Sequence, residues 1–251
     1  LQRLDELNDY NFYFQFTLTG YGRDMEPGVP HKKESVIPVF QKLSDKIGRE
    51  KMVWRYDPII FTDKYTPQYH LKAIRQIAGA LHGYTNKCVI SFVDIYAKNK
   101  KYLEALDPFF LTDRELALFA GEIAHIAGEH HMEAATCAEK SDLSSCGIKH
   151  NCCIDKELIS RITGCGIRGN KDKNQRKECG CMESIDVGTY NSCKNGCLYC
   201  YANATREQVS RTCGLFDPHS PLLCGTVSEE DNITVKKMTS LSLWQMTIWD
   251  A

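Results

Sequence analysis

The sequence predicts an α/β fold built as a partial or permuted (β/α) TIM-type barrel. From residue 12 to about 136, short β-rich runs alternate with longer helical patterns, which is typical of βαβ units and a parallel sheet. Five strand candidates are fewer than the roughly six to eight strands of a partial or complete barrel, which agrees with a truncated N-terminus. The chain has 251 residues, of which 43% are hydrophobic and 25% charged, so it is long enough for one sizeable domain of this kind.

The first βα unit is expected near the N-terminus. A strand over residues 12–19 places Phe14 and Phe16 on one face and polar side chains on the other. A helix over residues 35–47 follows, because proline is tolerated in the first turn of a helix and Gly48 is a stop signal.

The second unit repeats this order. Residues 52–56 form the next expected strand, and residues 67–82 place Leu71 and Ile74 on one face of a helix. Residues 88–93 are apolar and β-branched, which favours a third strand.

A capping box, in which Thr112 is followed by Glu115, predicts the start of a helix that runs to about residue 127 and ends at Gly128. The short run 132–136 is expected to be a strand. Together these features continue the alternation of strand and helix.

The last elements surround a polar loop. A helix is expected over residues 154–163 and closed by Gly164, and the polar residues 166–180 are interpreted as a loop. A strand over residues 184–187 and helix-compatible residues 202–209 complete the predicted set.

The charge and the hydropathy of the chain argue against two classes of protein, those that coat nucleic acid and those that span a membrane. A formal charge of -1 and a pI near 6.8 argue against a protein that coats nucleic acid. No run approaches the roughly 18 to 20 apolar residues that span a bilayer, so we expect a cytoplasmic protein without a membrane partner. In that compartment the thirteen cysteines indicate metal ligands more than disulfides, and all but Cys88 lie after residue 136.

The strongest chemical signal is the run Cys193-x-x-x-Cys197-x-x-Cys200, with Tyr199 directly before the third cysteine. Three thiolates at that spacing can hold three irons of a [4Fe-4S] cluster and leave the fourth iron without a protein ligand. The alternative is a zinc site or unrelated free thiols. Structural zinc takes four protein ligands, and neighbouring cysteines are able to supply the fourth, so both interpretations stay open.

The spacing and the aromatic residue resemble the cluster loop of the radical S-adenosylmethionine (SAM) superfamily, whose pattern is C-x-x-x-C-x-aromatic-C. The surrounding sequence resembles a narrower group, the radical-SAM-like domain of unknown function 1848. The segments that carry this resemblance are residues 14–22, 171–176, 179–181, 185–188 and 199–203. The likeness covers most of residues 10–225. It implies a [4Fe-4S] cluster that binds SAM and generates a 5'-deoxyadenosyl radical for an unknown substrate.

The resemblance also implies a SAM site and an electron donor such as a flavodoxin or ferredoxin. Tyr199 is expected near the adenine, with its backbone making the polar contact. Thr17 and Thr19 are further cofactor-binding candidates for a separate reason, since they lie at the carboxyl end of the first expected strand. Only about fifty residues follow Cys200, so earlier strands have to seat SAM, and the strand over residues 184–187 has to close the barrel. The members of the superfamily that this family most resembles include lyases that act on damaged DNA. The nearly neutral charge of the chain, however, gives no independent support for a nucleic-acid substrate.

A second group of cysteines is a candidate for another metal site. Cys137, Cys153, Cys179 and Cys181 fall at the end of a strand, near the start of a helix and in a Cys-Gly-Cys loop. Four thiolates placed there can hold an auxiliary iron-sulfur cluster or a zinc ion. The alternative is scattered buried cysteines that pack as small hydrophobes. Three other cysteines are alternative ligands for this second site, namely Cys146, Cys152 and Cys165.

Arg55 and Asp57 are the candidate catalytic residues, because working residues of parallel α/β folds lie at the carboxyl ends of strands. Asp94 holds a similar place. An arginine there can clamp a carboxylate or phosphate. The alternative is an Arg-Asp ion pair that satisfies itself at the rim.

The chain is expected to divide into barrel units over residues 1–165, a cysteine-rich cluster-binding segment over 166–225 that packs on the barrel, and a tail over 226–251. It begins with Leu1 and not Met. Members of the resembling family carry strands upstream, so we expect an N-terminally truncated barrel.

Two hypotheses for function follow. The first is a radical-SAM-type enzyme with an open iron at the Cys193, Cys197 and Cys200 loop. The second is a non-catalytic zinc or iron-sulfur module in which the cysteines are structural.

Overall fold

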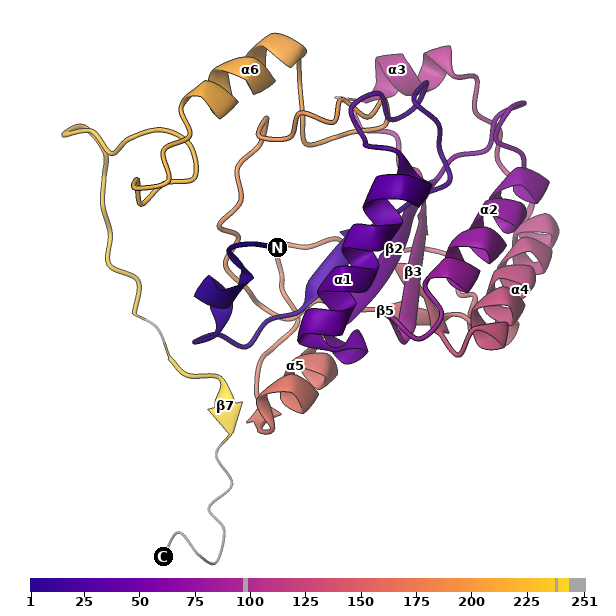
Figure 1. Ribbon diagram of the computed structural model, residues 1–251, viewed down its shortest axis with the longest axis horizontal. Coiled ribbons are helices and arrows are strands. Elements are labelled where there is room, and N and C mark those ends of the chain that lie inside the picture. Colours follow the sequence, from indigo (N-terminus) through magenta and orange to yellow (C-terminus); the bar gives the residue numbers. More distant parts are fainter. Residues whose placement is uncertain (97–98, 238, 244–251) are drawn as a thin grey trace, which may run out of the picture.

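The computed structural model describes residues 1–96, 99–237 and 239–243 (Figure 1). Its centre is a five-stranded sheet whose strands lie in sequence order and pair in parallel throughout. The strands are β1 (Phe14–Thr17), β2 (Met52–Ile59), β3 (Lys87–Phe92), β4 (Glu133–Cys137) and β5 (Lys149–Asn151). This confirms the α/β class. The outer strands β1 and β5 each pair with one neighbour, so closure into a barrel stays a prediction.

Helices connect the strands and extend the fold beyond the sheet. They are α1 (Ile37–Ile47), α2 (Pro67–Ala80), α3 (Lys100–Ala105), α4 (Asp113–Glu129), α5 (Lys156–Thr163) and α6 (Arg206–Gly214). A small antiparallel pair joins β6 (Gly166–Ile167) to β7 (Ser242–Leu243). Single helical turns lie at Leu4–Leu7, Lys32–Val36, Arg49–Lys51 and Ser144–Cys146. No helix in the described part of the chain has both the length and the apolar character needed to cross a membrane.

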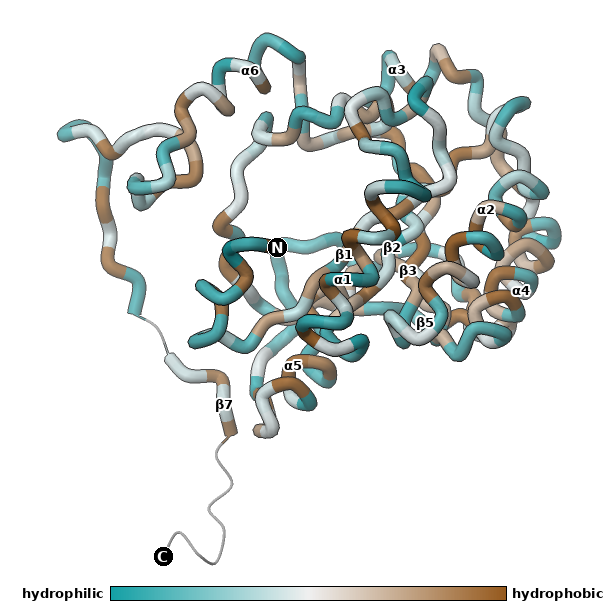
Figure 2. Tube along the Cα trace, viewed as in Figure 1, coloured by the Kyte–Doolittle hydropathy of each residue, from teal (hydrophilic) through white to brown (hydrophobic). Residues whose placement is uncertain are grey.

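The main hydrophobic core lies between one face of the sheet and helices α1, α2 and α4. Trp54 and Tyr56 of β2 are fully buried there, and Figure 2 shows hydrophobic stretches along β2 and β3. The alternation predicted for the first strand is confirmed, since Phe14 and Phe16 pack against this core. Side chains alternate along a strand, so Arg55 and Asp57 face the other way.

Helix α5 covers part of that opposite face. Its Leu158 packs in a small cluster with Val53 of β2 and Val89 of β3. Both valines precede the polar residues of their strands, so α5 covers the amino end of the face. Figure 1 shows α5 and α3 at opposite ends of the sheet. The carboxyl end of this face is therefore left to polar side chains.

Helix ends were predicted well where the sequence carries a specific backbone signal. Thr112 and Glu115 form the expected reciprocal capping box of α4. Gly48 and Gly164 follow α1 and α5 with φ of 90° and 69°, a region that glycine enters without strain. Gly128 is different, since α4 continues through it to Glu129, so the predicted stop there was wrong.

The predicted strand over residues 184–187 was also wrong. These residues are irregular, and Ile185 and Val187 are 50% and 85% exposed. The run has β-branched residues, but no strand among the described residues pairs with it, so it does not close the sheet. Conversely, neither α3 nor the three-residue strand β5 was predicted from the sequence.

His70 is buried against the second strand and gives a pH-dependent stability. Its Nδ1 lies 2.8 Å from the Tyr56 hydroxyl and its Nε2 3.1 Å from the Ile60 carbonyl oxygen, which accepts only. Nε2 therefore carries the proton and Nδ1 accepts from Tyr56. Burial lowers the pKa of His70 from its ordinary 6.5 to about 4, although the hydrogen bond to Ile60 opposes this.

We expect the free energy of unfolding to fall as the pH drops from about 6.5 to about 4, by up to about 3 kcal/mol from this group. In that window the unfolded chain binds a proton that the folded chain does not. His70→Gln, which keeps one donor and one acceptor, should flatten this dependence in urea unfolding curves. An equal slope in both proteins would show that other groups cause it.

Candidate functional site

The cysteine loop, residues 193–200, lies against the carboxyl edge of the sheet. The Leu198 N–H donates to the Met25 carbonyl at 3.0 Å, in the segment that follows β1. The Asn99 side-chain amide, after β3, donates to the Tyr199 carbonyl at 3.3 Å. Hydrogen bonds from the loops after two different strands thus hold the run at the edge where parallel α/β folds place their sites.

Gly28 lies directly against the backbone of this loop. Its N–H donates to the Asn195 carbonyl at 2.8 Å. A Cβ at Gly28 would lie 2.7 Å from the Asn195 carbonyl oxygen, 2.8 Å from Asn195 Cα and 2.9 Å from the Lys194 carbonyl oxygen. All three are backbone atoms, so no side chain fits there without moving one of the two segments.

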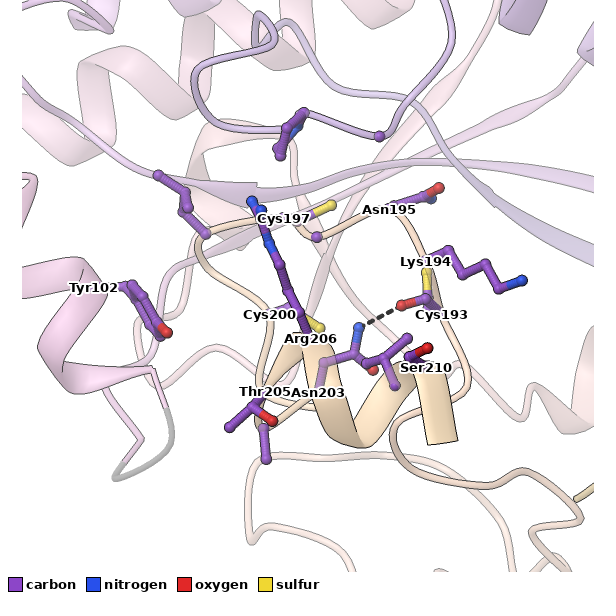
Figure 3. Close-up of a pocket in the computed structure, with 16 residues that line it drawn as sticks. Tyr102, Cys193, Lys194, Asn195, Cys197, Cys200, Asn203, Thr205, Arg206 and Ser210 are labelled. Carbon is purple, nitrogen blue, oxygen red and sulfur yellow. Dashed lines mark hydrogen bonds between the residues drawn. The ribbon is translucent and has the colours of Figure 1, made fainter. Parts of the chain in front are cut away.

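The three cysteines of the loop line one pocket of about 530 Å³ (Figure 3). The segment after β1, helix α3 and the start of α6 form the rest of its wall. Other residues that line it include Gly28, Tyr102, Asn203 and Arg206. Burial, and then the negative charge of Glu26, raise the pKa of the Cys197 thiol to about 11. The three thiols thus share one solvent-accessible space, although with the side chains as they stand no three His, Cys, Asp or Glu groups of the described residues surround a point where a metal ion would fit.

Asn203 carries an unsatisfied polar atom in the wall of this pocket. Its side-chain amide donates to the Cys193 carbonyl at 2.7 Å, the dashed line in Figure 3. Its Oδ1 is buried and has no hydrogen-bond partner in the described part of the chain. A buried acceptor without a partner costs free energy, so this oxygen is a candidate contact for the donor group of a ligand. Arg206, in the first turn of α6, contributes a guanidinium to the same pocket.

Tyr199 belongs to the loop but is not among the residues that line the pocket. Its hydroxyl donates to Glu26, and its ring is 5.7 Å from that of Tyr21 in a small apolar cluster. Burial, and then the charge of Glu26, raise the pKa of Tyr199 well above its ordinary value. Glu26 also accepts from Thr19 at 2.6 Å and pairs with Lys32 at 2.5 Å. This buried network ties the cysteine loop to the segment after β1.

The two threonine candidates are placed differently from each other. Thr19 is buried in the Glu26 network, whereas Thr17 is exposed at the end of β1. Neither is among the residues that line the pocket, so their role in binding a cofactor stays a prediction. Glu26 and Lys32 were not identified from the sequence, because no motif links them to cysteines so far along the chain.

The second group of cysteines is brought together. Cys179 and Cys181 are buried with Ala138, and Cys137 and Cys153 pack against them. The sulfurs of Cys137 and Cys153 are 3.3 Å apart. In the side-chain positions described, no three His, Cys, Asp or Glu groups of the described residues surround a point where a metal ion would fit.

Arg55 and Asp57 form an ion pair within β2, which continues beyond them to Ile59, so they do not lie at the strand end that the sequence predicted. Arg55 Nη1 also donates to Gln15 Oε1 at 2.6 Å and to the sulfur of Cys153 at 2.8 Å, while Ser91 donates to Asp57. The Arg-Asp ion pair, which the sequence offered as the alternative to a catalytic role, is therefore present. The guanidinium is committed to protein partners, one of which is a thiol.

Glu139 is a further group at this rim that sequence reasoning missed. It follows β4 and accepts the Phe92 N–H at 2.8 Å. Burial, opposed by that hydrogen bond, raises the pKa of Glu139 to about 7. Asp94 lies nearby and forms an ion pair with Arg176 of the cysteine-rich segment. A carboxyl group that titrates near neutral pH at a strand end is suited to proton transfer.

One family model matches the sequence. It is described as domain of unknown function (DUF1848) and covers residues 1–202, a span that includes the sheet and the cysteine loop. No curated protein and no solved structure matches the chain.

Proposed function

The chain belongs to the family of the domain of unknown function DUF1848, and from the pocket at its sheet edge we propose that it is a radical-SAM-type iron-sulfur enzyme. In this proposal Cys193, Cys197 and Cys200 hold a [4Fe-4S] cluster and SAM occupies the open iron. The substrate is unidentified. The observation that carries the proposal is that all three thiols line one pocket at the carboxyl edge of a parallel sheet.

The residues of the pocket fit this cofactor in two respects. Three cysteine ligands without a fourth leave one iron of a cubane cluster open. The unpartnered Oδ1 of Asn203 suits the ammonium group of an amino acid, and the Arg206 guanidinium suits its carboxylate. When bound, the reduced cluster supplies the electron that cleaves SAM to a 5'-deoxyadenosyl radical.

The protein's own residues orient and support the site. The bonds from Gly28 and Leu198 hold the cysteine loop against the sheet edge. Glu26 accepts a hydrogen bond from Tyr199 and is itself paired with Lys32. These contacts support the loop through a side chain that does not line the pocket. An external electron donor such as a flavodoxin or ferredoxin is part of the proposal, since reduction of the cluster requires one.

The second candidate is a non-catalytic module whose metal is structural. The observation that favours it is that the same loop joins segments from two strand ends, which a closed metal site would also stabilise. Anaerobic preparation of the full chain separates the two candidates. The enzyme should carry about four irons and four sulfides per cluster, show an EPR signal that shifts on adding SAM, and release 5'-deoxyadenosine under reduction. Colourless, zinc-loaded protein would rule out the enzyme.

Arg206 provides a more specific prediction. Arg206→Gln should leave the iron content unchanged but raise the SAM concentration needed for the EPR shift by about tenfold, since a charge-assisted hydrogen bond is lost. Arg211→Gln is the matched control, because Arg211 lies on the same helix but is not among the residues that line the pocket. Equal SAM dependence in both variants would remove Arg206 from carboxylate binding.

A further inference from the structure

Four cysteines from three separate segments meet beside the sheet, and none of them lines the pocket of the cysteine loop. Cys137 ends β4, Cys153 lies between β5 and α5, and Cys179 and Cys181 flank Gly180. They form one buried cluster. Buried cysteines do pack as small hydrophobes, but the polar groups around these sulfurs require a further explanation.

Two backbone N–H groups point at the sulfur of Cys181. The Cys153 N–H is 3.1 Å and the Ile154 N–H 3.3 Å from it. A neutral thiol is a weak acceptor, so two donors directed at one sulfur suit a thiolate better than a thiol. Hydrogen bonds of this kind to ligand atoms orient and stabilise metal-thiolate sites.

A cationic donor lies on the other side of the group. Arg55 Nη1 is 2.8 Å from the sulfur of Cys153. The guanidinium cannot give up its proton, so it favours negative charge on that sulfur. Asp57 and Gln15 hold the guanidinium in this position. Ligand-stabilising donors are thus present at two of the four sulfurs.

The separation of the sulfurs indicates which kind of centre fits. The Cys137 and Cys153 sulfurs are 3.3 Å apart. Metal-sulfur bonds of about 2.3 Å in a tetrahedron place two thiolates about 3.8 Å apart. Thiolates on different irons of a cluster are held farther apart, because a metal-metal separation lies between them. The sulfurs of Cys137 and Cys153 therefore need only a small movement apart to share one ion. The side chains of Cys179 and Cys181 have to rotate toward that ion, because no three groups of the described residues surround a metal position in the side-chain arrangement described.

We propose that Cys137, Cys153, Cys179 and Cys181 form a tetrathiolate site for a single ion of the zinc type. Each bound ion replaces the thiol protons, which pass to solvent, and no electron is transferred. The site staples the Cys179–Cys181 segment to the ends of β4 and β5, so its binding free energy adds to the stability of the fold. The proposal does not depend on the function of the cysteine loop.

The test uses the full chain with Cys193, Cys197 and Cys200 all changed to serine, so that only the second group is left to bind. Titration with Co²⁺ should saturate at one ion per chain, with thiolate-to-cobalt charge-transfer absorption and the intense visible bands of tetrahedral sites. This measurement leaves all four cysteines of the group intact, so it does not depend on whether a variant of that group folds. Absence of these bands would overturn the proposal.

Further variants in the same background test the ligand set. Cys181→Ser should weaken cobalt binding by about a hundredfold, because one of four metal-sulfur bonds is lost. Cys165→Ser is the matched control, since its sulfur bonds to Thr163 outside the cluster. Cys152→Ser tests the neighbour of Cys153 and should also bind normally. Iron with sulfide at this site, or equal binding by the Cys181 variant, would contradict a mononuclear tetrathiolate.

Discussion

Changing Cys197 to serine in the full chain is expected to abolish the iron-sulfur cluster that we propose for the cysteine loop. Iron at this loop should fall from about four atoms to near zero, because a cubane held by three thiolates loses one of its few protein bonds. Release of 5'-deoxyadenosine should fall to background with it. Iron and sulfide analysis, EPR spectroscopy and product chromatography after anaerobic reconstitution check this result.

The control for this change is Cys146→Ser, whose thiol is partly buried elsewhere and does not line the pocket. It should keep its iron and its SAM-dependent EPR shift. If Cys197→Ser keeps a full complement of iron and still produces 5'-deoxyadenosine, the loop is not the cluster site. Loss of zinc in place of iron would instead favour the structural module.

Gly28→Ala is expected to displace the cysteine loop without touching any ligand. The added Cβ would lie 2.7–2.9 Å from backbone atoms of Lys194 and Asn195, and backbone atoms do not yield cheaply. Overpacking of this kind costs roughly 1–3 kcal/mol. The cluster should therefore be lost to a chelator several times faster than in the unchanged protein, and residues 188–205 should be cut more readily by a protease.

Gly121→Ala is the matched glycine change. A Cβ at Gly121, inside α4, meets no atom within 4 Å. Alanine is favoured over glycine in a helix by up to about 1 kcal/mol, so this variant should be unchanged or slightly more stable in urea. Equal rates of cluster loss in the Gly28 and Gly121 variants would show that the contact at Gly28 does not hold the loop.

Local signals allowed much of the fold to be predicted. The alternation of Phe14 and Phe16, the capping box at Thr112 and the stop at Gly48 each depend on a few neighbouring residues. Elements that depend on distant partners were not predictable in this way. β5 has the sequence Lys-His-Asn and exists because it pairs with β4.

The same distinction between local signals and contacts with distant segments holds for the candidate site. The spacing of Cys193, Cys197 and Cys200 is local, and their shared pocket was expected from it. The second cysteine group was named from its position at element ends, and its members do come together. Glu26 and Glu139 were missed, because burial and contacts with other segments give them their importance, and neither is visible along the chain.

The cysteine loop lies far along the sequence from the residues that support it, so the two are expected to come together late in folding. Tyr199 bonds to Glu26 across 173 positions, whereas the sheet is built from neighbouring βα units. Contacts between distant positions form slowly, and chains emerge from the ribosome amino end first. We therefore expect the sheet and its helices to fold before the three thiols arrive, so that insertion of the proposed cluster would be among the last steps of maturation.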